Sequence, residues 1–389
     1  MMAAVTAASY GASVICLERN DRVGKKLAIT GKGRCNLTNN SDNENILRNI
    51  PTNSRFLYGA LAGFSAYDTM DFFENVLGVP LKTERGNRVF PQSDRAIDIV
   101  NALKSEMDRL GVIVVKCRAE RINTENGEVV SVSGGGKTFY APKVILATGG
   151  VSYPATGSTG DGYKMAEALG HTVVQPKAML VPIETNEDCA PLSGLTLKNV
   201  RLSLMSSAGK TLYSEQGELL FTHFGVSGPL VLSASAYVRE DGCRLSVDLK
   251  PALDEKTLDA RILRDFSAEP NRQLSNVLKK LLPQALIPEV LSRAGLSGEI
   301  KANAVTKEQR RSLLQTLKSF TLSVKTLRPV EEAIITDGGI SVKEIDPKTM
   351  QSKLVKGLYF AGEIIDCAAY TGGYNLQIAF ATGRKAGES

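Results

Sequence analysis

The hydrophobic pattern at the start of the chain predicts a helix followed by a buried strand. Met1–Tyr10 reads as a helix that Gly11 ends, and Ser13–Leu17 is an apolar run of strand length closed by Glu18. A helix, a glycine and a strand ending in an acidic residue form the second half of a Rossmann βαβ unit, where the carboxylate binds a ribose hydroxyl. The first strand and G-x-G-x-x-G loop of such a unit are missing from this chain, and we expect in-frame codons for them directly upstream.

The pattern that follows predicts helices and then a run of short strands. Ala66–Leu77 has the apolar spacing of an amphipathic helix, and Ser93 is the expected N-cap of a helix that ends at Leu110. Short strands are expected at 112–117, 120–124, 129–132 and 137–140, with Asn-Gly and Gly-Gly-Gly turns between the last three. The apolar strand Val144–Ala147 then runs into Thr148-Gly149-Gly150. This order predicts an antiparallel meander in place of a Rossmann crossover helix.

The character of the chain changes after residue 175. Short alternating runs predict a β-rich part at 176–250, and helical periodicity predicts a helical part at 251–330. The apolar run Gly357–Ala361 then reads as a further buried strand, and a last helix is expected from about Tyr374. The sequence therefore predicts a discontinuous α/β dinucleotide-binding domain, residues 1–175 and 331–389, interrupted by an inserted domain at 176–330.

Composition narrows the class of protein. The chain is 43% hydrophobic and 23% charged, as is usual for a globular protein, and no apolar run approaches the ~18 residues of a membrane helix. Its 6 cysteines form no C-x-x-C pair and it has 2 histidines, so we expect no metal site and a reducing, cytoplasmic location. The net charge is +6, and residues 251–330 hold 14 basic and 8 acidic side chains. This basic excess is either a phosphate-binding face or a solvated helical surface.

Three separate stretches could contact a dinucleotide. They are Glu18, Thr148-Gly149-Gly150, and the C-terminal stretch with Gly362-Glu363, Asp366 and Gly372–Asn375, where a glycine-rich loop opens a helix. Together they favour a flavin cofactor, FAD, in a Rossmann-like domain. Gly31–Asn36 fails the G-x-G-x-x-G pattern at its last position, so no second dinucleotide domain is visible. NAD(P)H would then be a transient electron donor.

Four motifs resemble the YhiN/BaiN-like family of bacterial flavoproteins, also called aminoacetone oxidase-like. The motifs are GKKLAITGKGRCNLTN (24–39), ATGGVSYPATGSTGDGY (147–163), LLFTHFGVSGP (219–229) and LYFAGEIIDCAAYTGGYN (358–375). The resemblance implies an FAD domain with an insert that has a β part and a helical part. It also implies a G-G-G-x-A-G type loop directly before Met1. One departure is Lys32, because the family usually has three consecutive glycines there.

The resemblance further implies which residues contact FAD. They are Glu18, Lys25, Lys26, Gly31, Lys32, Gly33, Arg34, Cys35, Asn36, Thr148, Gly149, Gly362, Asp366, Gly373, Tyr374, Asn375 and Leu376.

The two histidines receive different expectations. His223, in the LFTHFG motif, is either an acid–base or binding group at the substrate side of the flavin, or a structural residue packed between Phe221 and Phe224. His171 follows Gly170 and is expected at the start of a strand.

The sequence leaves three functions open. The first is an FAD-dependent oxidoreductase acting on a small molecule, with no membrane involved. The second is an enzyme that reduces uridine to dihydrouridine in ribosomal RNA, for which Lys279, Lys280, Arg310 and Arg311 are the first candidate RNA contacts. The third is a flavin-free binding protein.

Overall fold

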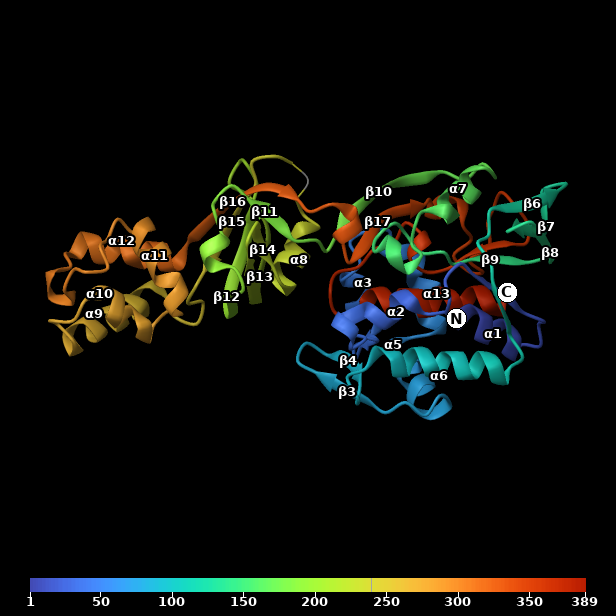
Figure 1. Cartoon of the computed structure of the whole chain (residues 1–389), viewed down its shortest axis with the longest axis horizontal. Coiled ribbons are helices and arrows are strands. Elements are labelled where there is room, and N and C mark those ends of the chain that lie inside the picture. Colours follow the sequence, from blue (N-terminus) through green and yellow to red (C-terminus); the bar gives the residue numbers. More distant parts are fainter. Residues whose placement is uncertain (239) are drawn as a thin grey trace. The chain divides into compact units, whose positions relative to one another are not determined.

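The computed structural model describes residues 1–238 and 240–389 (Figure 1). The chain forms two compact units. The first contains Met1–Met179 and Pro329–Ser389, and the second contains Leu180–Arg328. The predicted boundary at residue 176 falls inside strand β10 (Val173–Met179), which pairs with β17 (Ile335–Ile340) of the C-terminal segment.

The first unit is built around two pairs of parallel strands. Strand β1 (Ile15–Glu18) pairs with β5 (Ile113–Lys116), and β9 (Val144–Leu146) pairs with β18 (Leu358–Phe360). Parallel neighbours need crossover connections, as in dinucleotide-binding folds. Because β18 comes from the C-terminal segment, the first unit is closed only by residues beyond the insertion. The predicted strands at the start, at Val144–Ala147 and at Gly357–Ala361 are confirmed.

The predicted antiparallel meander is also confirmed. It contains β6 (Arg121–Glu125), β7 (Glu128–Gly134) and β8 (Lys137–Tyr140), paired in that order. At the β6–β7 turn, Asn126 and Gly127 have φ angles of 50° and 79°. Two successive positive φ angles are what an Asn-Gly hairpin turn supplies, so the local sequence sets this turn.

Three helices pack around the parallel strands. They are α1 (Met2–Ser9), α6 (Ala96–Arg109) and α13 (Tyr374–Glu388), the red helix that lies beside α1 in Figure 1. A Cβ on Gly387 would lie 2.7 Å from the Ala3 carbonyl oxygen. The helix that begins the described chain and the helix that ends it therefore touch through a position that admits no side chain.

One predicted helix detail was wrong, and one predicted helix is confirmed with an irregular second half. The N-cap of α6 is Arg95 rather than Ser93, whose hydroxyl instead accepts the Arg95 N–H and donates to Asp98. The helix predicted at Ala66–Leu77 is α5 (Ala66–Asp71), which continues as one π-helical turn.

The remaining elements of the first unit are short. They are α2 (Lys25–Ile29), α3 (Asn43–Arg48), α4 (Tyr58–Gly63), α7 (Asp161–Glu167), and the three-stranded sheet of β2 (Thr38–Asn39), β4 (Arg88–Pro91) and β3 (Leu81–Glu84).

The second unit is a closed barrel with an attached helical layer. The barrel strands, in spatial order, are β11 (Ile183–Thr185), β14 (Gly225–Ser227), β13 (Thr211–Thr222), β12 (Thr196–Met205), β15 (Arg244–Asp248) and β16 (Phe320–Leu327). Helix α8 (Pro229–Ser235) packs on the barrel strands. Closure removes the free strand edges that would otherwise invite aggregation.

The helical layer contains α9 (Glu255–Ala268), α10 (Leu274–Val277), α11 (Ile287–Arg293) and α12 (Lys307–Lys318). One continuous apolar core joins these helices to the barrel. The segment predicted as helical was wrong at its end, because Phe320–Leu327 is the strand β16 that closes the barrel.

Candidate functional site

The carboxylate of Glu18 is held at the end of β1. Its Oε1 accepts hydrogen bonds of 2.8 Å from both the backbone N–H and the side-chain amide of Asn20. The same amide donates to the carbonyl of Thr156 at 2.9 Å. Glu18 is thereby fixed beside the 147–163 motif, at the carboxyl end of a parallel strand where Rossmann folds bind a ribose.

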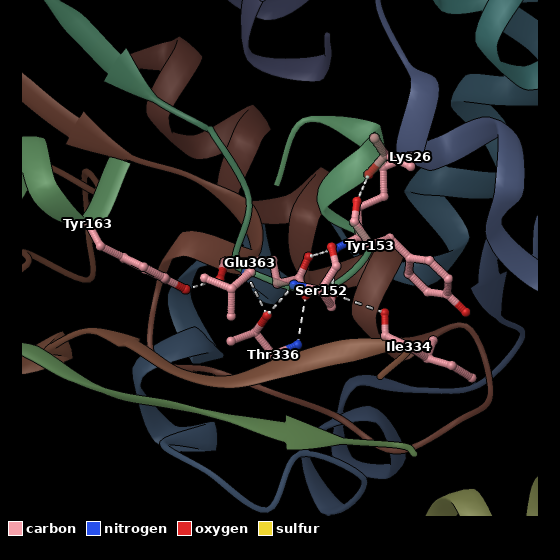
Figure 2. A network of polar contacts seen from close by, with 9 residues as sticks. Lys26, Ser152, Tyr153, Tyr163, Ile334, Thr336 and Glu363 are labelled. Carbon is pink, nitrogen blue, oxygen red and sulfur yellow. Dashed lines mark hydrogen bonds and ion pairs between the residues drawn. The ribbon is translucent and has the colours of Figure 1, made fainter. Parts of the chain in front are cut away.

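A second polar centre joins three distant segments of the first unit (Figure 2). The ammonium of Lys26 lies 2.5 Å from Glu363 Oε2 and 2.8 Å from the Ser152 hydroxyl. That hydroxyl also donates to Glu363 Oε1 at 3.1 Å. The side chains of Lys26 and Glu363 are only 24% and 20% exposed, so this ion pair is largely shielded from water and loss of either partner would be costly. We call Lys26, Ser152, Glu363 and Thr336 the Lys26 network.

Thr336 of β17 completes this network. Its backbone N–H donates to Glu363 Oε1 at 2.8 Å, and its hydroxyl accepts from the N–H groups of Val151 and Ser152 at 2.9 and 3.2 Å. A Cβ on Gly150 would lie 2.3 Å from this hydroxyl, so the chain can pass here only as glycine. The Gly-Gly turn after β9 is therefore fixed by a residue of the C-terminal segment.

The strand ends next to this network have features that suit a bound ligand. Thr148 Oγ1 is buried and has no hydrogen-bond partner among the described residues. Gly149 and Gly362 follow β9 and β18 with φ angles of 74° and 76°, and a Cβ on Gly362 would meet only Ala379, at 3.7 Å. A buried hydroxyl without a partner is costly, so a ligand that bonds to it would be favoured. The residues present therefore fit a dinucleotide cofactor.

The glycine-rich loop after α2 runs largely through left-handed backbone. Gly31, Lys32, Gly33 and Cys35 have φ angles of 57°, 58°, 83° and 59°. Lys32 thus adopts a conformation that glycine takes without cost and that costs other residues about 1 kcal/mol or more. A non-glycine residue thus occupies a strained position where the family usually has glycine.

The guanidinium of Arg34 forms ion pairs with neighbouring carboxylates. Its guanidinium pairs with Glu84 and Asp94, each at 2.5 Å, and lies 4.2 Å from the centre of the Phe90 ring. Lys82 pairs with Asp94 at 2.6 Å. The hydrogen bond from Arg34 lowers the pKa of Glu84, and those from Lys82 and Arg34 lower the pKa of Asp94. We call these four charges the Arg34 network.

The residues after Arg34 join this loop to the start of α13. Cys35 is buried, which raises the pKa of its thiol to about 12, so it is an inert packing group. The amide of Asn36, oriented to satisfy its neighbours, accepts the Gly373 N–H at 2.9 Å. The Asn375 side chain bonds to both the N–H and the carbonyl of Ala369. Asn36 and Asn375 thus shape the loop whose backbone opens α13.

Two more expected cofactor contacts lie in the same segment. Tyr374 is buried, and Leu376 is partly buried against the main core of the first unit. Asp366 is also buried, which raises its pKa, and its carboxylate accepts a 2.9 Å hydrogen bond from Asn53. Lys25, by contrast, pairs with the exposed Asp21 at 3.1 Å.

Tyr153 stands out beside the Lys26 network. It has a φ angle of 51° and is 37% exposed, and Ile334 nearby is 38% exposed. A bulky residue with positive φ is a genuine outlier, and such strain concentrates at functional sites. Tyr153 was not among the predicted site residues.

The histidines lie elsewhere. His223 is exposed at the β13–β14 turn with its ring 5.0 Å from that of Phe224, whereas Phe221 is buried and stacks on Phe320. His171 is buried two residues before β10 rather than starting it, and bonds to Ser352 at 2.9 Å. Burial lowers the pKa of His171.

The sequence analysis named Glu363 only as part of the C-terminal stretch that could contact a dinucleotide, and did not single out Ser152 or Thr336. The signal for the first two was available, because Glu363 follows the glycine after β18 and Ser152 lies inside the 147–163 motif. Thr336 carried no local signal.

No group of three or more His, Cys, Asp or Glu side chains among the described residues could hold a metal ion. No helix in the described part of the chain is long and apolar enough to cross a membrane.

Comparison with known proteins identifies the class. The family described as HI0933-like protein Rossmann domain matches residues 1–389. The chain belongs to this family, the YhiN/BaiN-like FAD flavoproteins, which are oxidoreductases. The predicted family and the predicted Rossmann-type FAD-binding fold are confirmed.

Individual relatives differ in what they act on. The chain is 30% identical to the ribosomal RNA dihydrouridine synthase of Haemophilus influenzae, over 98% of this chain and 93% of that protein. It is also 30% identical to the 3-dehydro-bile acid delta(4,6)-reductase of Clostridium scindens, over 100% of this chain and 96% of that protein. Among solved structures, the FrdA chain of Escherichia coli quinol fumarate reductase is similar with a TM-score of 0.48 at 15% identity, covering 100% of this chain and 67% of that chain.

Proposed function

We propose that this chain is an FAD-dependent reductase of ring carbon–carbon double bonds, with the flavin held by its first unit. The observation that carries the proposal is the hydroxyl of Thr148, which directly follows β9, is buried and has no hydrogen-bond partner among the described residues, in the unit that also contains the Glu18 carboxylate and the Lys26 network. Ligands of open parallel sheets bind outside the carboxyl ends of the strands.

Named residues would hold the cofactor. Glu18 would accept hydrogen bonds from ribose hydroxyls, and Thr148 would bond to a polar atom that its surroundings leave unmatched. Gly149 and Gly362 would let the backbone approach the cofactor, since neither carries a Cβ. The first turn of α13, after Gly373, would direct free N–H groups and a positive dipole end at negative charge. FAD, when bound and reduced by an electron donor, would supply two electrons as a hydride.

The names of the relatives support a common reaction. A dihydrouridine is a uridine saturated at its ring double bond, and a delta(4,6)-reductase saturates ring double bonds of a 3-oxo acid. Both substrates place the double bond in conjugation with a carbonyl. The reaction adds a hydride to one carbon and a proton to its neighbour, with NAD(P)H as the proposed source of the electrons. His223 is the proposed acid–base or binding group on the substrate side.

The first test is the visible spectrum of the purified protein. We expect a flavin band, and FAD as the compound released on denaturation. Anaerobic addition of NADPH or NADH should bleach the band, and an acceptor with a conjugated ring double bond should restore it. Two acceptors distinguish the substrate classes: a uridine-containing ribosomal RNA fragment and a 3-oxo-Δ4,6 steroid acid. Protein that never takes up flavin would instead support the flavin-free binding protein.

A second test concerns His223. Replacing His223→Gln should leave flavin content and bleaching by NAD(P)H unchanged and slow the return of the band on adding acceptor. An unchanged rate would assign His223 to a structural role.

A further inference from the structure

Some basic side chains of the helical layer form ion pairs with carboxylates, and others do not. Four of the eight carboxylates at residues 251–330 form ion pairs within the layer. The pairs are Asp259–Arg310, Asp265–Arg261, Glu289–Arg293, and Glu269 with both Arg272 and Lys280. Lys280 and Arg310, two of the four candidates chosen from the sequence, therefore already have partners. Arg310 is only 18% exposed and is a poor RNA contact.

Six other cations of the layer are exposed and form no ion pair within the described residues. Lys279 and Lys301 lie outside α9 and α12, and the remaining four lie on these two helices. They are Lys256 and Arg264 on α9, and Lys307 and Arg311 on α12. Within the described residues, none of the four forms an ion pair with a carboxylate. We call these four side chains the α9/α12 face.

The packing of the two helices shows that these cations share one side. Asp259 pairs with Arg310 at 2.7 Å, while the later residue Lys318 donates to the carbonyl of Leu253, before α9 begins, at 2.8 Å. The helices therefore run antiparallel, and the Asp259–Arg310 pair marks where they face each other.

The helical rotation then places each cation. At about 100° per residue, Lys256 and Arg264 lie about 60° and 140° from Asp259, on the side away from the buried Leu258 and Ile262.

The same rotation applies to α12. Lys307 and Arg311 lie about 60° and 100° from Arg310, and the antiparallel direction turns them to the same side as the α9 cations. Leu313, on the opposite side of Arg310, is fully buried. The four charges thus form one outward surface.

Folding accounts for this arrangement only in part, through Glu255 and Glu308, which lie beside Lys256 and Lys307 in the same first turns. Lys256 and Lys307 lie in the first turns of their helices, where a positive charge opposes the helix dipole. Four like charges on one face also repel each other. A polyanionic partner would relieve both effects.

We infer that the α9/α12 face binds the phosphate backbone of RNA. The inference rests on the proposed function, since a reductase that acts on a base in RNA needs a surface that holds the polymer. Four phosphate contacts predict that the logarithm of affinity falls with the logarithm of salt concentration with a slope of about −2.8 for single-stranded and about −3.6 for duplex nucleic acid.

The experiment compares three double variants of the full chain with the parent. Lys256→Gln with Lys307→Gln removes two charges from the face, and Lys256→Arg with Lys307→Arg keeps them. Lys198→Gln with Lys210→Gln is the matched control, because these exposed lysines belong to the barrel. The probe is a uridine-containing ribosomal RNA hairpin titrated at several salt concentrations. Flavin content, bleaching by NAD(P)H and Tm are measured on the same samples.

We expect the Gln face variant to lose affinity and to reduce the salt slope by about 1.4 to 1.8, with Tm unchanged or higher. The Arg variant and the barrel control should match the parent. Equal loss in the barrel control, or parental binding by the Gln face variant, would overturn the inference. A parent protein that does not bind RNA would also overturn the inference. If the flavin of that protein is still bleached by NAD(P)H, the proposed reductase activity remains supported. RNA binding through the α9/α12 face by protein that takes up no flavin would support this inference and contradict the proposed reductase.

Discussion

Lys26 and Arg34 belong to the same glycine-rich motif, yet their charges are met in different ways. The Lys26 network joins three segments of the first unit and is mostly buried, whereas the Arg34 network is more exposed and links the loop to the nearby β3–β4 hairpin. Arg34 pairs with two carboxylates, whereas Lys26 pairs with one carboxylate and bonds to one hydroxyl, that of Ser152. The comparison teaches that one family motif can hold both a mostly buried cation that joins distant segments and a more exposed cation that fastens the loop to a neighbouring hairpin.

The largest effect should come from a side chain at Gly373, where the start of α13 packs against the backbone that follows the glycine-rich loop. A Cβ on Gly373 would lie 2.3 Å from the Thr38 carbonyl oxygen, and Gly373 has a φ of 98°. Gly373→Val should destabilise the first unit by more than about 3 kcal/mol. Urea unfolding followed by circular dichroism measures this. The collision is with backbone, so instability should appear even without flavin, and a fully stable variant would contradict the packing described.

Removing the buried cation should have the next largest effect. Lys26→Met leaves Glu363 charged and only 20% exposed, which should cost about 1–3 kcal/mol and lower flavin content. The neighbouring Lys25→Met is the control, because its partner Asp21 is largely exposed. If the two variants had equal unfolding midpoints, the buried ion pair would contribute no more to stability than the exposed one.

A change at Lys32, which lies between Lys26 and Arg34 in the sequence, should stabilise the protein rather than destabilise it. Lys32→Gly relieves the left-handed strain at the cost of some chain entropy, and should stabilise the protein by about 0.5–1 kcal/mol. Lys32→Ala removes the same charge but keeps the strain and should show no such gain. Chemical denaturation of both variants separates the two causes, and a gain in the alanine variant would point to charge instead.

The smallest effect is expected for Arg34→Gln, because the charges it meets are exposed to solvent. The lowered pKa values of Glu84 and Asp94 give this effect a pH dependence. Carboxylates with lowered folded-state pKa values stabilise the fold above their ordinary values of 4.5 and 3.8, and this contribution disappears as pH falls through the folded values. The Tm difference between variant and parent should therefore vanish in acid. A difference that grows below pH 4 would rule out this ion-pair origin.

Local patterns predicted the elements of the first unit well. The strands before Glu18 and Gly362 were found because parallel strands read as apolar runs, and the β6–β7 turn was found because Asn-Gly sets its own geometry. The N-cap of α6 was misplaced because Ser93 bonds to Asp98, five residues on, instead of capping the helix.

Contacts between distant residues could not be predicted in this way. Thr336 reaches Ser152 across nearly half of the chain, and Arg34 meets Glu84 and Asp94 fifty and sixty residues away. Nothing in the local sequence specifies those partners. The role of His223 stays a prediction, since its exposed position at a barrel turn suits either role.

The contact between α1 and α13 has a consequence for how the protein is made. A chain leaves the ribosome from its first residue onward, so α1 emerges long before its partner helix α13. In the same way, β9 emerges long before β18, the strand with which it pairs. The barrel and its helices are continuous in sequence and can form as soon as β16 has emerged. On stalled ribosomes, the insertion should therefore become resistant to protease first. The N-terminal segment Met1–Met179, although it is synthesised earlier, should remain cleavable until α13 has been released.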